Sequence, residues 1–100
     1  MTNFKAYYAH SKKDYDSPQE GRDIYRIIAR FPKAEVICPN NHLGELGSLQ
    51  AYLNVVDTCD FLFVREYKGY VGRGVFHEVA RAMSNRLQVW ALVDYKEGKT

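Results

Sequence analysis

The stretch that decides the fold is residues 60–82, DFLFVREYKGYVGRGVFHEVARA. Its continuous apolar run at residues 61–64 predicts a central parallel strand that is buried on both faces. A loop follows, with Gly72 and Gly74 just before an expected helix and Glu78 in the first turn of that helix. Glycines let a backbone approach a ligand, and a helix N-terminus offers unpaired N–H groups. The pattern therefore predicts a site that can hold an anion one turn away from a carboxylate.

The rest of the chain repeats a strand-then-helix pattern around this stretch. Short apolar runs predict further strands at residues 4–10, 34–38 and 87–93. Ser17-Pro18 and Ser48 are helix-start signals. Each precedes apolar residues spaced i, i+3, i+4, i+7, which are Ile24, Ile27, Ile28 and Phe31, and then Leu49, Tyr52, Leu53 and Val56. The order βαβαβαβ predicts an α/β fold, a Rossmann-like (flavodoxin-like) three-layer sandwich with a four-stranded, mainly parallel sheet and three helices.

The totals predict one domain, residues 1–95, followed by a C-terminal tail at 96–100. A net charge of +2 on 100 residues is too small to favour a nucleic acid polymer or a membrane surface as partner. Cys38 and Cys59 form no CxxC pair and have no zinc-type spacing to the histidines, which predicts reduced thiols and no metal site. With no long apolar segment, the chain is expected to be cytoplasmic.

In a parallel sheet, ligands bind outside the carboxyl ends of the strands, near the switch in strand order. The first strand ends there with His10 and Ser11, which are both predicted to contact the substrate, and Ser11 could donate a hydrogen bond to a phosphate or hydroxyl. Tyr7 and Tyr8 point to opposite faces, so we expect one in the core and the other available to a ligand or to Glu78.

The turn Gly72-Arg73-Gly74 is the best phosphate candidate, with Arg73 or Lys68 adding charge; a simple turn is an equally good interpretation. GRGVFH resembles the dinucleotide fingerprint GxGxxG, but His77 replaces the third glycine. The motif also follows the third strand instead of the first. No cofactor is therefore predicted.

Glu78 lies one helical turn, ~5.4 Å, beyond Gly74. The helix dipole favours its ionised form, so it suits a nucleophile or an electrostatic stabiliser better than a general acid. The alternative is an ordinary solvated glutamate in the first turn of a helix, a common feature with no chemical role.

Three segments together resemble the nucleoside 2-deoxyribosyltransferase-like superfamily: AYYAHS (6–11), CDFLFV (59–64) and VGRGVFHEVARA (71–82). That superfamily includes deoxynucleoside 5′-monophosphate N-glycosidases and small phage-type relatives. The resemblance implies a glutamate nucleophile at Glu78, which attacks the anomeric carbon of a 2′-deoxynucleoside, and a tyrosine at Tyr7 that orients it. It further implies sugar or phosphate contacts at Gly72, Gly74 and Ser11, and a homo-oligomer in which a neighbouring subunit completes the pocket.

A second hypothesis stays open beside this one. The superfamily's aspartate that handles the leaving base falls on Tyr52, with Asn54 and Asp57 nearby. Without that aspartate, the same fold could bind or sequester a nucleotide, or a signal molecule derived from one, with no turnover. The two hypotheses share their predicted site residues and their partner, a nucleoside or nucleotide.

Overall fold

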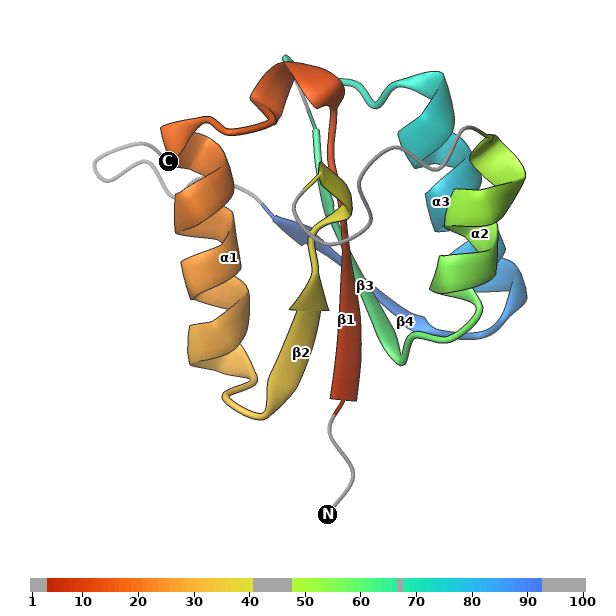
Figure 1. Ribbon diagram of the computed structural model, residues 1–100, viewed down its shortest axis with the longest axis horizontal. Coiled ribbons are helices and arrows are strands. Elements are labelled where there is room, and N and C mark those ends of the chain that lie inside the picture. The colour runs from red at the N-terminus through yellow and green to blue at the C-terminus, as the bar shows by residue number, and fades with distance from the viewer. Residues whose placement is uncertain (1–3, 41–47, 67, 93–100) are drawn as a thin grey trace.

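The computed structural model describes residues 4–40, 48–66 and 68–92. The chain alternates strands and helices around one four-stranded sheet in which every strand is parallel (Figure 1). The strands are β1 (Phe4–Ala9), β2 (Ala34–Ile37), β3 (Phe61–Arg65) and β4 (Gln88–Leu92), in the order β2-β1-β3-β4. The helices are the 3-10 helix η1 (Lys12–Asp14), α1 (Pro18–Arg30), α2 (Leu49–Val56) and α3 (Arg73–Ser84). The predicted α/β fold with three α-helices is confirmed.

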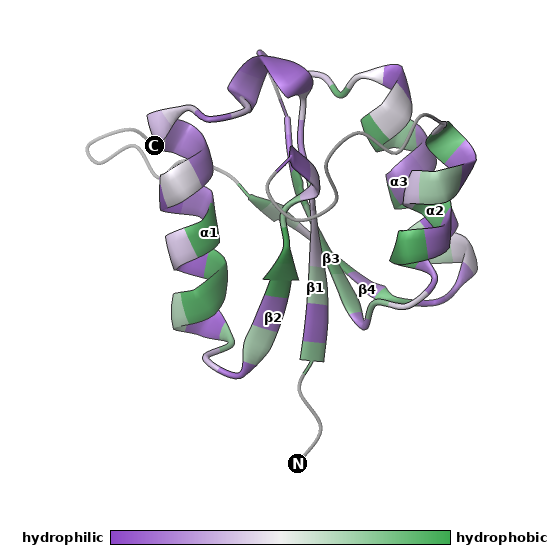
Figure 2. Ribbon diagram, in the orientation of Figure 1, coloured by the Kyte–Doolittle hydropathy of each residue, from purple (hydrophilic) through white to green (hydrophobic). Residues whose placement is uncertain are grey.

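The sheet separates two layers of helices, with α1 over one face and α2 and α3 over the other (Figure 1). Because side chains alternate along a strand, β1 feeds both layers. Ala6 and Tyr8 lie in the core beside α1, while Tyr7 and Ala9 lie in the core beside α2 and α3. Figure 2 shows hydrophobic residues along the strands and polar residues over much of the helix surfaces. The strand order switches between β1 and β3. The chain passes from β1 to β2 on one side, and then crosses back to place β3 on the other side of β1.

The helix starts follow their sequence signals. Ser17 caps α1 by accepting a hydrogen bond from the Glu20 N–H, and Pro18 occupies the first turn. Ser48 caps α2 in the same way through the Ala51 N–H. The predicted apolar stripe of α1 is wrong at one position, because Ile28 is 44% exposed while Ile27 is buried. A single helix over this face of the sheet buries only the side chains that point at the strands.

The start of α3 differs from the prediction. The helix begins at Arg73, so Gly72 is its N-cap and Gly74 already lies inside it. Glu78 consequently lies in the second turn and is buried, and the prediction of a first-turn glutamate is wrong. Its neighbours Val75 and Ala82 share its buried face, and this periodicity turns Glu78 inward.

Some predictions fall outside the part of the chain that the structure describes. These are the tail at 96–100 and, before it, the end of the last expected strand and of the domain at residues 93–95. Within the described residues, no helix is long and apolar enough to cross a membrane.

Candidate functional site

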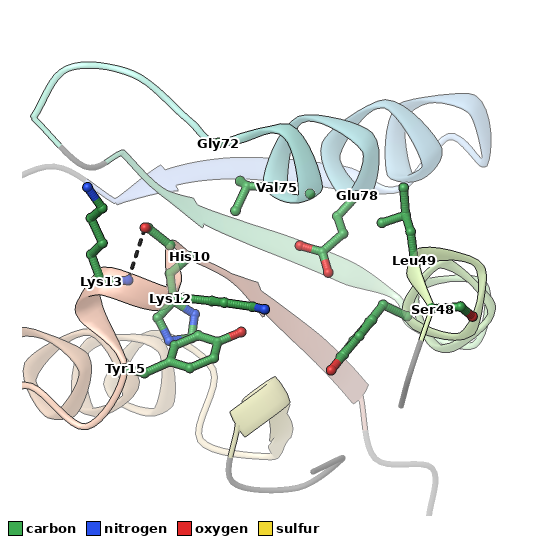
Figure 3. Close-up of a pocket in the computed structure, with 12 residues that line it drawn as sticks. His10, Lys12, Lys13, Tyr15, Ser48, Leu49, Gly72, Val75 and Glu78 are labelled. Atoms are coloured by element: carbon green, nitrogen blue, oxygen red, sulfur yellow. Dashed lines mark hydrogen bonds between the residues drawn. The ribbon is translucent and has the colours of Figure 1, made fainter. Parts of the chain in front are cut away.

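A pocket of about 570 Å³ opens at the carboxyl edge of the sheet, where the sequence predicted a ligand site (Figure 3). It lies between η1 on one side and α2 and α3 on the other. Its volume is within the range of about 300–1,000 Å³ that small-molecule sites occupy. The lining residues are His10, Ser11, Lys12, Lys13, Tyr15, Ser48, Leu49, Tyr52, Gly72, Gly74, Val75 and Glu78.

Glu78 is the acidic residue of this pocket. Its carboxylate points from α3 into the space between η1 and α2 (Figure 3). The Tyr7 side chain reaches Glu78 from β1, on the same face of the sheet, and its hydroxyl donates a hydrogen bond to Glu78 Oε2. No other hydrogen bond joins Glu78 to a side chain in the described ranges. One carboxylate oxygen is therefore held in place, and the other remains available to a ligand.

Burial controls the protonation of this pair. It raises the pKa of Glu78 to about 7, and the hydrogen bond from Tyr7 only partly opposes that rise. Burial, together with the nearby Glu78 carboxylate, raises the pKa of Tyr7 far above its usual value. The Tyr7 hydroxyl thus remains a donor at every physiological pH. Glu78 is divided between its two forms near neutrality, whereas the sequence predicted a carboxylate ionised by the helix dipole.

The two predicted glycines open the pocket at the start of α3. A Cβ atom added to Gly72 or Gly74 would meet no atom within 4 Å, so packing within the protein does not require glycine at either position. Gly72 has a φ of −75°, which any residue adopts. It has no side chain with which to cap the first N–H groups of α3. Both glycines therefore leave room for a ligand beside an uncapped helix N-terminus.

The cationic side of the pocket comes from η1. Lys12 and Lys13 line the pocket, and Figure 3 shows them on the side opposite α3. Ser11 lines it too, and its hydroxyl caps η1 by accepting the Lys13 N–H at 3.1 Å. Arg73, predicted to add charge, is exposed and does not line the pocket. The spacing of the two lysines in the sequence did not identify them as site residues, because only the turn of η1 places them across the pocket from Glu78.

Aromatic residues provide the flat surfaces of the pocket. Tyr15 follows η1, and Tyr52 belongs to α2; both are half-buried. Burial raises the pKa of Tyr15 to about 12, so its hydroxyl is neutral. Tyr52 stands where the resemblance placed the superfamily's aspartate, and it lines the pocket itself. Sequence analysis missed Tyr15 as a site residue, because nothing distinguishes it from the other seven tyrosines before the fold is known.

The opposite face of β1 carries a second tyrosine–carboxylate pair. Tyr8 donates to Asp23 Oδ2 at 2.5 Å, and Arg65 binds the same carboxylate through Nε at 2.9 Å and a terminal nitrogen at 2.5 Å. Burial alone would raise the pKa of Asp23, but hydrogen bonds from Arg65, Tyr8 and Gln19 outweigh it and lower that pKa. Tyr7 and Tyr8 are both fully buried, and of the two contacts expected from the sequence, with a ligand or with Glu78, Tyr7 makes the one with Glu78.

His10 lies at the pocket wall but is itself a buried residue. Its Nδ1 is 3.1 Å from the Tyr8 carbonyl oxygen, and its Nε2 is 2.7 Å from Glu20 Oε2. Both ring nitrogens are thus engaged within the protein, and a ligand in the pocket meets the edge of an already bonded ring. The role predicted for His10 in substrate binding stays a prediction.

The sequence was also compared with known proteins. No protein-family model matches it, and no curated protein is significantly similar to it.

Proposed function

We propose that the protein cleaves or transfers the N-glycosidic bond of a 2′-deoxynucleoside or of its 5′-monophosphate, with Glu78 as the nucleophile. The observation that carries the proposal is the pair formed by Tyr7 and Glu78. A buried carboxylate with one oxygen held by a tyrosine and the other facing a pocket of about 570 Å³ has the arrangement of an oriented nucleophile.

The pocket offers a matching surface for each part of such a substrate. The N–H groups at the start of α3, with Lys12 and Lys13 across the pocket, favour an anion such as a 5′-phosphate. Gly72 and Gly74 leave space for the sugar next to Glu78. Tyr15 and Tyr52 offer rings on which a base could stack. These features support a nucleotide in preference to a purely apolar ligand.

The proposed reaction proceeds in two displacements. The carboxylate oxygen of Glu78 that Tyr7 does not hold forms a bond to C1′ of the deoxyribose. The bond from C1′ to the base nitrogen breaks, and its electron pair leaves with the base, which takes a proton from water. A water molecule, or a second base, then attacks C1′ and releases Glu78 as a carboxylate.

The test is a search for free base. The protein is incubated with a panel of 2′-deoxynucleosides and their 5′-monophosphates, and the products are separated by chromatography. We expect base release from at least one member, abolished in Glu78→Gln and retained in Glu35→Gln, which changes a carboxylate on β2 that does not line the pocket. If no member of the panel yields free base, catalysis on this substrate class is excluded.

One observation favours a second candidate, binding without turnover. Glu78 is the only carboxylic acid among the pocket-lining residues that the structure describes, so no second acid is available there to protonate the leaving base. This candidate expects a nucleotide to raise the melting temperature and to be recovered unchanged. A ligand that binds and is recovered as base and sugar excludes it.

The proposal includes two further expectations: a cytoplasmic location, which the sequence composition suggested, and a homo-oligomer whose neighbouring subunit closes the pocket, which the resemblance implies. Sedimentation velocity on the purified chain tests the second. A monomer at every concentration used in the activity assay contradicts it.

A further inference from the structure

Three side chains with metal-binding atoms meet on the α1 side of the sheet, although the sequence spaces them far apart. They are His10 directly after β1, Glu20 in the first turn of α1, and Cys38 directly after β2. One ligand atom from each lies within 4.8 Å of the other two, and all three residues are buried. The cluster is distinct from the Tyr7–Glu78 pair, which lies on the other face of β1.

The ring of His10 is held in the orientation that a metal ligand needs. It stacks on Tyr8 with centroids 3.8 Å apart and planes 3° from parallel. Its Nδ1 faces the Tyr8 carbonyl oxygen at 3.1 Å, where an N–H must donate. Nε2 faces Glu20 Oε2 at 2.7 Å, and a metal ion would replace the proton of that hydrogen bond; the Cys38 sulfur lies within 4.8 Å. A histidine that donates its second nitrogen to a backbone carbonyl is the usual support of a bound metal.

We propose that His10 Nε2, the Glu20 carboxylate and Cys38 Sγ bind one Zn²⁺ ion. The three donors are a nitrogen, an oxygen and a sulfur, a set that suits the borderline-soft Zn²⁺ better than Mg²⁺ or Ca²⁺. On binding, Cys38 releases its thiol proton to solvent and coordinates as a thiolate, and the proton shared by His10 Nε2 and Glu20 Oε2 is also released to solvent. One thiolate, one carboxylate and a neutral imidazole then balance the two positive charges of the ion. A neutral cluster is the form that this buried position tolerates best.

Small movements convert the cluster into a coordination site. Tetrahedral ligands of zinc lie about 3.3 Å apart for a nitrogen–oxygen pair. The separation of 2.7 Å between His10 Nε2 and Glu20 Oε2 therefore has to open slightly. Glu20 Oε1 keeps the hydrogen bond from the Asp16 N–H, at 3.2 Å, during that movement. The weak bond that the Cys38 thiol donates to Asn40 Oδ1 is lost and replaced by the zinc–sulfur bond.

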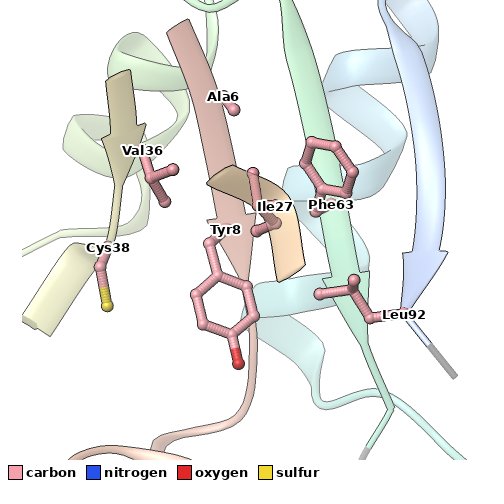
Figure 4. Close-up of a cluster of buried hydrophobic side chains, with 7 residues drawn as sticks. All are labelled: Ala6, Tyr8, Ile27, Val36, Cys38, Phe63 and Leu92. Atoms are coloured by element: carbon pink, nitrogen blue, oxygen red, sulfur yellow. The ribbon is translucent and has the colours of Figure 1, made fainter. Parts of the chain in front are cut away.

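The edge of the site is reachable, since His10 also lines the large pocket. Three protein ligands leave a fourth position for water, as in zinc sites that are not purely structural. Figure 4 shows the side chains of Cys38 and Tyr8 near the ends of their strands. The sequence alone predicts no metal site, because ligands at positions 10, 20 and 38 match no short spacing motif.

The experiment uses Co²⁺ as a spectroscopic substitute for Zn²⁺ on the full-length, metal-free, reduced protein. We expect saturation at one ion per chain, visible bands of tetrahedral strength, and a near-ultraviolet sulfur-to-cobalt charge-transfer band. Adding Zn²⁺ should abolish these bands, and Zn²⁺ alone should raise the melting temperature. A saturated spectrum without the charge-transfer band overturns the site, as does the absence of binding at millimolar metal.

The second buried thiol provides the matched control. Cys59 lies in the core beside α2 and α3, on the opposite face of the sheet from Cys38. Cys38→Ser should remove the charge-transfer band and weaken Zn²⁺ binding by at least about tenfold, whereas Cys59→Ser should change neither. Glu20→Gln should weaken binding while keeping the charge-transfer band. If Cys59→Ser removes the band, or Cys38→Ser retains it, the assignment is wrong; the wild-type spectrum decides the matter if a variant fails to fold.

Discussion

The hydroxyl of Tyr7 donates a hydrogen bond to Oε2 of Glu78, which joins β1 to α3 across 71 positions of sequence. The bond orients a buried carboxylate that lines the pocket. In the described ranges, Tyr7 is the only side chain that forms a hydrogen bond with this carboxylate. A single interaction thus links the packing of α3 against the sheet to the chemistry proposed for the site. The stability and the activity of the protein should both respond to pH through this pair.

Glu78→Gln should alter how stability depends on pH. Burial raises the pKa of Glu78 to about 7 in the folded chain, above its value of 4.5 in the unfolded chain. The folded state therefore keeps the proton on Glu78 to a higher pH than the unfolded state does. The contribution of Glu78 to the free energy of unfolding is largest below pH 4.5, and it is lost as pH rises through 7. Replacing Glu78 with the neutral amide should remove this loss, which amounts to about 3 kcal/mol above pH 7. Urea unfolding of both proteins between pH 4 and pH 8 measures the difference, and a difference that is constant across this range contradicts the prediction.

Base release, if Glu78 is the nucleophile, should rise with pH. Only the ionised carboxylate attacks, so the rate should increase through a midpoint near pH 7, set by the raised pKa of Glu78. A protonated Glu78 acting as a general acid would give the reverse profile, with the rate falling through the same midpoint. The measurement is kcat/KM for the best substrate in overlapping buffers at constant ionic strength.

Tyr7→Phe should move that midpoint upward. The hydrogen bond from Tyr7 opposes the effect of burial on Glu78, so its removal raises the pKa of Glu78 further above 7. It also costs about 1–3 kcal/mol of stability, because a buried carboxylate loses its donor. The titration of Glu78 is followed by carbon NMR of its labelled carboxyl group.

Tyr8→Phe provides the control for this prediction. It removes the matching bond from Tyr8 to Asp23 on the other face of the same strand. We expect lower stability with no shift in the titration of Glu78. A shift of equal size in both variants would mean that the pair formed by Tyr7 and Glu78 has no special role.

Asp23→Asn should destabilise the protein by about 3–5 kcal/mol. Asp23 is fully buried and accepts two hydrogen bonds from Arg65, so the change leaves the guanidinium buried without this carboxylate. Asp57→Asn is the comparison, since Asp57 makes the same kind of two-pronged pair with Arg81 in partly exposed positions. Solvent screens that pair, so its loss should have a much smaller effect. Equal midpoints of denaturation for the two variants would contradict the prediction.

Local signals predicted the framework of the fold, because each element carries its own start, stop and period. Ser17-Pro18 and Ser48 start helices where their capping chemistry requires it. The apolar run at 61–64 forms a central strand because a strand between two helical layers must be apolar on both sides. The start of α3 was misjudged because Gly74 reads as a helix breaker, although the helix tolerates it in the first turn.

The candidate site was predictable only in part. Glu78 and Tyr7 could be named because the resemblance supplied their roles, and the glycines because of their local pattern. The contributions of Lys12, Tyr15 and Tyr52 depend on the placement of η1 and α2 around the pocket, which no short motif encodes. Glu20 shows the limit most clearly. Glu20 lies three residues after Ser17, the position at which a capping box would use its side chain, but the fold directs its carboxylate to His10 and to the Asp16 N–H.

Gly74→Ala should make the protein more stable and a worse binder. Gly74 lies in the first turn of α3, where alanine is the better helix former by up to about 1 kcal/mol, and its Cβ would meet no protein atom. The added methyl group instead occupies space in the pocket beside Glu78, so the affinity for a nucleotide should fall. Isothermal titration with the best ligand, together with the melting temperature of the ligand-free protein, measures both effects.

The matched control is Gly21→Ala, on an exposed position of α1 that also has no atom within 4 Å of an added Cβ and does not line the pocket. It should give a similar gain in stability with unchanged affinity. The opposite signs of the two effects in Gly74→Ala are the informative result. A glycine retained only to form a turn would lose stability on substitution, whereas a glycine retained to admit a ligand should lose binding alone. If Gly74→Ala binds as tightly as the wild type, the ligand does not approach the start of α3, and the phosphate position proposed there is wrong.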